Sequence, residues 1–154
     1  MRELRLKMLT TLPPAVGDVT TEASSRVYGV LMDWHLNEHI ISVGALSDGN
    51  ASLYTTSTFG VIGGIYHASV RTAAIAFVRA AELHYGAGAF TTNYVYPSPG
   101  QTLFYLLGVD GVCVIDAKTN AVARGRGGLS DLFAAGQRVM TELRIVTEEM
   151  DEMQ

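Results

Sequence analysis

The fold is decided by residues 27–56, VYGVLMDWHLNEHIISVGALSDGNASLYTT, in which apolar stretches alternate with short polar turns. Val27–Trp34 and Ile40–Leu46 predict two strands, because both are rich in β-branched and aromatic residues. Ser47–Asn50 predicts a tight turn, since Asp, Gly and Asn tolerate the positive φ angles of hairpins. Ala51–Thr56 then predicts a third strand. Strands joined this tightly pair antiparallel, because a parallel crossover needs about a dozen residues or more.

Two later segments predict long helices. His67–His84 contains neither Gly nor Pro, is rich in Ala, and ends at the glycines of Tyr85–Gly88. Its apolar residues recur at helical spacing and predict a buried face made of Val70, Ala73, Ala74, Phe77, Ala80, Ala81 and Leu83. The second helix begins near Ser130. Its apolar stripe is Leu132, Phe133, Gly136, Val139, Met140, Leu143 and Val146.

The residues between these helices predict more strands. Thr102–Leu107 and Gly111–Asp116 form a hairpin, and Ala121–Arg124 is a candidate short sixth strand. The predicted class is α+β: a central antiparallel sheet of about five to six strands, in the order β-β-β-α-β-β-(β)-α, flanked by two long helices. A parallel α/β fold is the alternative, which the short hairpin turns disfavour.

Composition indicates one domain. A chain of 154 residues, 48% of them hydrophobic, can bury a core without disulfides. Within the single domain 1–154, we expect an N-terminal arm or added edge strand over 1–26, a core over 27–147 and an acidic tail over 148–154. The tail's negative charges lie at the C-terminal end of a helix, which already carries a partial negative charge, so we expect them to fray it into a solvated tail. The alternative is that the tail is a docking segment for a basic partner.

Charge and cysteine usage exclude several classes. The formal charge of −4 disfavours nucleic acid as a partner. The single cysteine, Cys113, excludes an intrachain disulfide and is expected to pack as a core hydrophobe. No apolar run is long enough for a membrane span, and no signal-peptide core precedes the charged N-terminus, so the expected location is the cytoplasm.

The turn before the first long helix is the candidate ligand site. Gly60-Val-Ile-Gly63-Gly64 lets the chain enter the helix, whose N-terminus offers unpaired amides to an anion. The candidate residues are Gly63, Gly64, His67 and Arg71, with Tyr54, Phe59 or Tyr66 as aromatic walls. The motif lacks the lysine of a phosphate loop and differs from the dinucleotide fingerprint. The alternative is that these glycines only allow the chain to turn.

No catalytic or metal motif stands out. His35 and His39 are four residues apart but flank a predicted hairpin turn, so we expect no metal there and no cofactor. No Gly-x-Ser-x-Gly sequence is present. A hydrolase or isomerase that uses His67 with a nearby serine or carboxylate stays open as a third hypothesis, and it needs a cleft that brings the two groups together.

Several of these segments together resemble a known family. The strands of Val27–Leu46, the Ala-rich helix, the Leu103–Ile115 hairpin and the closing helix are similar to the roadblock/dynein-light-chain group, which shares its flanked antiparallel sheet with profilin and longin domains. The likeness covers about residues 26–146. Roadblock domains begin with a helix, where this chain has a Pro-containing arm. Tyr28–Asp33 and Phe104–Leu107 also resemble segments of small bacterial proteins to which no role is assigned.

The resemblance implies a non-catalytic module that dimerises and binds small GTPases or motor-associated partners. We therefore expect a protein-interaction or regulatory module, a homodimer with a possible small-GTPase partner, rather than an enzyme. The alternative function is a small-ligand or anion sensor whose site lies at Gly60–Arg71.

Overall fold

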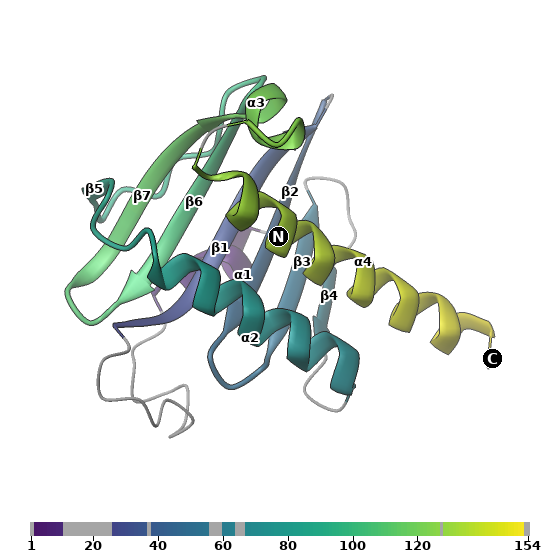
Figure 1. Cartoon of the computed structure of the whole chain (residues 1–154). Helices are drawn as coiled ribbons and strands as arrows, with labels where there is room; N and C mark the ends of the chain where they lie inside the picture. Colours follow the sequence, from purple (N-terminus) through teal and green to yellow (C-terminus); the bar gives the residue numbers. More distant parts are fainter. Residues whose placement is uncertain are drawn as a thin grey trace.

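Strand β1 (Val27–Leu36) lies at the centre of the molecule and pairs on both sides. The computed structural model describes residues 2–10, 26–36, 38–55, 60–63, 67–126 and 128–152. In that part of the chain, seven strands form one antiparallel sheet in the order β4-β3-β2-β1-β6-β7-β5 (Figure 1). The predicted α+β class with an antiparallel sheet and two long helices is confirmed.

The first half of the sheet is a meander. The predicted strands that follow β1 are β2 (His39–Leu46) and β3 (Ala51–Thr55), and β4 (Gly60–Gly63) adds a strand that the sequence did not predict. The turn between β2 and β3 contains Gly49 at φ +96°, and the Asp48 carboxylate accepts the Asn50 amide at 2.9 Å. This is the turn chemistry that the Asp-Gly-Asn sequence predicts.

The second half contains β5 (Ala89–Phe90), β6 (Gln101–Gly108) and β7 (Gly111–Lys118). Strand β6 pairs with β1, so the later hairpin joins the meander at the sheet's centre. The two additional strands, β4 and β5, bring the described sheet to seven. Both strands are short and contain glycine or alanine, residues that are depleted in strands, so the residue pattern did not predict them.

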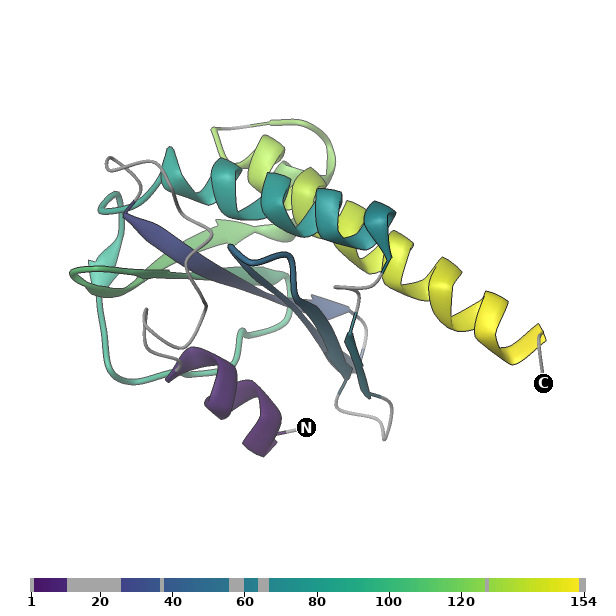
Figure 2. The same ribbon diagram turned by 90° about the horizontal axis from the view of Figure 1, so that it is seen from below.

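Helices α2 (Ala68–Glu82) and α4 (Ser130–Glu152) lie side by side on one face of the sheet (Figures 1 and 2). The α2 residues buried there are Val70, Ala73, Ala74, Phe77, Val78 and Ala81. Gly136 allows α4 to approach closely, because a Cβ at this position would lie 2.8 Å from the sulfur of Met32 and 3.0 Å from the ring of Phe77. The predicted helix faces are therefore largely correct.

Helix α1 (Arg2–Leu9) covers the opposite face, as Figure 2 shows. Met8 and Leu9 pack against a second apolar cluster that includes Leu31, Tyr105 and Leu107. Gly44 allows this contact, because a side chain at Gly44 would collide with the sulfur of Met8. The sheet is thus covered on both faces at its centre.

Four sequence predictions need correction. Residues 2–9 form a helix in place of the arm or edge strand expected over 1–26, of which residues 1 and 11–25 lie outside the described residues. Thr119–Ala123 forms the short helix α3 in place of a sixth strand over Ala121–Arg124. Leu83 is 85% exposed because it follows the last residue of α2. Helix α4 continues to Glu152, through the segment expected to be an acidic tail.

A buried ion pair anchors α1. The Arg5 guanidinium donates to Asp33 Oδ2, with Nε 3.0 Å and Nη2 2.5 Å away. Arg5 also donates to the carbonyls of Tyr94 and Val95, each at 3.1 Å. The Ser42 hydroxyl donates to the other Asp33 oxygen at 2.6 Å. One side chain therefore joins α1, β1 and the segment that precedes β6.

Aromatic rings enclose this ion pair. The guanidinium carbon lies 4.2 Å from the centre of the Tyr96 ring and 5.6 Å from that of Tyr105. Arg5 is 3% exposed and Asp33 is fully buried. Burial raises the pKa of Asp33, although the hydrogen bonds and charge of Arg5 oppose this change. Burial lowers the pKa of Arg5. The hydrogen bond and the negative charge of Asp33 oppose this effect and outweigh it, so the pKa of Arg5 lies above its ordinary value.

We predict that Asp33→Asn lowers the free energy of unfolding by about 3 kcal/mol, because it leaves a buried guanidinium without its counter-charge. Urea denaturation at pH 7 measures the change. Arg79→Met is the control, since this arginine is exposed on α2 and lies outside the Asp33 cluster; we expect a change of at most about 0.5 kcal/mol there. Equal losses in the two variants would contradict the anchoring role of Asp33.

The buried hydroxyl of Tyr105 makes the stability of the protein depend on pH in the alkaline range. The Tyr105 hydroxyl donates to the Val95 carbonyl at 2.5 Å, and burial, with the negative charge of Asp33 nearby, raises the pKa of Tyr105 to about 12. Unfolded tyrosine ionises near pH 10. The stability that this shift contributes is therefore complete below about pH 10 and is lost as the pH rises through about 12.

Absorbance titration at alkaline pH tests this shift. The difference between wild type and Tyr105→Phe should contain one tyrosine that ionises near pH 12, and the stability of the variant should fall less between pH 10 and 12. A difference curve centred near pH 10 would show that Tyr105 ionises like an unfolded tyrosine, which would contradict the raised pKa.

Candidate functional site

The described residues of the predicted anion site lie at the end of β4 and the start of α2. Gly63 is the last residue of β4, His67 is the N-cap of α2, and Arg71 follows one turn later. Gly64 lies outside the described residues, as do Phe59 and Tyr66. The His67 side chain makes no capping hydrogen bond. The structure thus places His67 and Arg71 near each other on one helix, and an anion site there stays a prediction.

Arg71 also contacts a neighbouring element of the sheet. A Cβ at Gly49 would collide with the aliphatic part of the Arg71 side chain. The stem of Arg71 therefore lies against the turn between β2 and β3. This contact gives Arg71 a packing role beside any role in ligand binding.

The histidines are dispersed. His35 and His39 lie on the two strands of the β1–β2 hairpin, while His67 and His84 lie at opposite ends of α2. Among the described residues, no three His, Cys, Asp or Glu side chains are grouped as metal ligands would be. Cys113 is fully buried and packs in the core, as its sequence neighbours predict.

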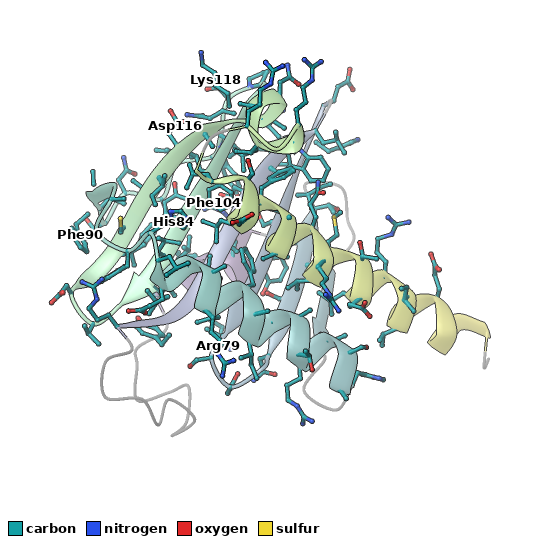
Figure 3. All side chains as sticks on the ribbon, in the orientation of Figure 1. Arg79, His84, Phe90, Phe104, Asp116 and Lys118 are labelled. Atoms are coloured by element: carbon teal, nitrogen blue, oxygen red, sulfur yellow. The ribbon has the colours of Figure 1, made fainter. Side chains whose placement is uncertain are left out.

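A hollow of about 650 Å³, which we call the apolar hollow, lies where the β6–β7 turn meets α1 and β5. Its apolar lining is Leu9, Tyr28, Phe90, Tyr94, Val109 and Val112. Phe90 is 51% exposed and Val109 is 60% exposed, and both stand at its rim. Figure 3 shows Phe90 on β5, at the outer side of the sheet.

Tyr85 contacts three residues that line this hollow. Its hydroxyl donates to the Gly111 carbonyl at 2.9 Å and accepts the Asp110 amide at 3.0 Å. Its ring stands edge-on to Phe90, with the ring centres 5.6 Å apart. A side chain at Gly108 would collide with this ring, so the glycine leaves room for it. Burial raises the pKa of Tyr85, which keeps the hydroxyl available as a donor.

A second hollow, of about 620 Å³, lies at the other end of the β6–β7 hairpin beside α3. We call it the basic hollow, because its lining includes Lys118, Arg124 and Arg126 against the single carboxylate of Asp116. All four of these side chains are exposed. Lys118 and Asp116 stand near the end of β7 (Figure 3). This arrangement can bind an anion.

No sequence pattern predicted either hollow. Arg124 and Arg126 are a close basic pair without aromatic neighbours, and no pattern connects them to Asp116 or to Ser98–Gly100. The usable signals were Pro99-Gly100 and Gly125, which predict turns but not what the turns enclose. Both hollows depend on contacts between residues distant in the chain.

No helix in the described part of the chain is long and apolar enough to cross a membrane. Comparison with known proteins finds no matching protein-family model, no matching curated protein and no matching solved structure.

Proposed function

We propose that this protein is a non-catalytic interaction module that forms a homodimer through the rim of the apolar hollow. The observation that carries the proposal is the exposure of Phe90 and Val109 at 51% and 60%. Both residues line a hollow whose other apolar side chains are Leu9, Tyr28, Tyr94 and Val112. Exposed apolar side chains that line the same hollow are typical of protein contacts.

The hollow offers shape as well as apolar area. Tyr85 and the β6–β7 turn hold its wall in place through hydrogen bonds on both sides of the Tyr85 hydroxyl. A preformed wall lowers the entropy that is lost on binding. An aromatic side chain beside such a wall is the usual type of residue at the centre of an interface.

Charge favours a second copy as the occupant. Arg26 and Asp110 flank Val109, whose amide donates to the Arg26 carbonyl at 2.9 Å, and both charged residues are exposed. In a two-fold interface the same surface meets itself, so Arg26 of one copy can approach Asp110 of the other. A rim with both signs of charge is therefore complementary to itself.

A small GTPase is the further partner that the roadblock resemblance implies. The homodimer would bind the GTPase through surfaces that lie outside the dimer interface. Titration calorimetry with a purified small GTPase, loaded in turn with GDP and GTP, tests this part of the proposal independently of dimerisation.

We predict a dimer in sedimentation at micromolar concentration. The double variant Phe90→Ser/Val109→Ser should weaken dimerisation at least about tenfold, which corresponds to 1.4 kcal/mol, because it removes the apolar rim. Thermal denaturation of the monomeric fraction checks that the variant folds.

Ile145→Ser is the matched control, since Ile145 on α4 is 42% exposed and distant from the apolar hollow in sequence and element. It should leave the dimer unchanged. A wild-type monomer at these concentrations would overturn the proposal. Loss of the dimer in the Ile145 variant alone would place the interface on the helices and contradict the surface proposed.

A further inference from the structure

The basic hollow is built from two rigid turns. Residues 98–101 form the first, in which the Gln101 amide donates to the Ser98 carbonyl at 2.9 Å and Gly100 has φ +80°. Pro99 followed by such a glycine is typical of a type II turn. The Gln101 side chain also accepts the Ser98 amide at 2.8 Å. This wall is therefore fixed at both its ends.

The second wall is the end of α3 (Thr119–Ala123), which closes with a Schellman motif. The Arg126 amide donates to the Ala121 carbonyl at 2.9 Å, and the Gly125 amide donates to the Val122 carbonyl at 3.3 Å. Gly125 has φ +75°, the left-handed conformation that this motif requires. The backbones of Arg124 and Arg126, on either side of Gly125, are held by this motif.

Two hydrogen bonds join the walls. The Thr119 amide donates to the Gly100 carbonyl at 2.9 Å, and the hydroxyls of Thr102 and Thr119 lie 2.7 Å apart. The floor between the walls is the end of β7, with Ala117 and Lys118. The hollow is thus preformed, and only its long cationic side chains must be ordered when a ligand binds.

The charge in this hollow is unbalanced. Within the part of the chain that the structure describes, Lys118, Arg124 and Arg126 form no salt bridge. The whole chain has a formal charge of −4, so this local excess of positive charge differs in sign from the rest of the molecule. An anion placed among the three cations would relieve their mutual repulsion.

We propose that the basic hollow binds a small phosphate monoester. Arginine forks match the geometry of phosphate oxygens, and Lys118 adds a third positive charge. Asp116 lies beside these cations and accepts hydrogen bonds from hydroxyl groups on the remainder of the ligand. A volume of about 620 Å³ suits a sugar-sized compound.

A nucleic acid fits this hollow less well. The lining of the basic hollow contains no aromatic side chain on which a base could stack. The negative charge of the whole chain also opposes binding of a long polyanion. The basic hollow shares no residue with the apolar hollow, so ligand binding and dimerisation can succeed or fail separately.

Titration calorimetry with the full chain tests the proposal, with ribose 5-phosphate, inorganic phosphate and ribose as probes. At about 0.15 M salt, which screens long-range attraction, ribose 5-phosphate should bind saturably and more tightly than inorganic phosphate. Ribose should not bind. Arg124→Gln/Arg126→Gln should weaken binding of ribose 5-phosphate at least about tenfold, because two of the three cations are lost.

Arg79→Gln/Lys7→Gln is the matched control, since it removes the same charge from exposed positions on α2 and α1. It should leave binding unchanged. Absence of binding by both phosphate probes, or equal weakening in the control, would overturn the proposal. A glutamate-rich peptide that binds while ribose 5-phosphate fails to displace it would also overturn it, by assigning the hollow to an acidic protein segment.

Discussion

The structure depends on a carboxylate placed at the centre of a sheet. Asp33 lies on β1 with its side chain fully buried on the face that α1 covers, and Arg5 of that helix provides its counter-charge. A helix of eight residues has little stability alone, so its place comes from packing and from this ion pair. Desolvation opposes the attraction between the two charges. The pair therefore specifies where α1 and the Tyr94–Val95 segment lie more than it adds stability.

Covering both faces of the central strands determines where function can reside. Helices α2 and α4 occupy one face, and α1 with the segment before β6 occupies the other (Figure 2). Within the described residues, two accessible hollows lie at the two ends of the β6–β7 hairpin. One end carries the apolar hollow with Phe90 and Val109, and the other carries the basic hollow with Arg124 and Arg126. Under the two proposals above, the protein binds a second copy of itself at one end and a small anion at the other.

The local parts of the fold were predictable, and the long-range parts were not. The turn at Asp48-Gly49-Asn50 and the apolar periodicity of α2 depend on neighbouring residues, so the sequence alone predicts them correctly. Arg5 and Asp33 are separated by 28 residues, and neither has neighbours that signal the pairing. Thr119–Ala123 is compatible with a strand by composition, and tertiary context makes it a helix. The predicted site residues His67 and Arg71 were placed by local spacing alone, whereas both hollows need contacts across the sheet.

Amide hydrogen exchange in α1 tests the central claim most directly. If Arg5 and its neighbours hold the helix on the sheet, the amides of residues 6–10 should exchange at least about tenfold more slowly than in an isolated peptide of the same sequence, because that peptide would not stay helical. The amide of Thr10, which donates to the Leu6 carbonyl at 3.0 Å, belongs to this group. Exchange of these amides at the peptide's rate, while β1 and β6 remain protected, would contradict the account.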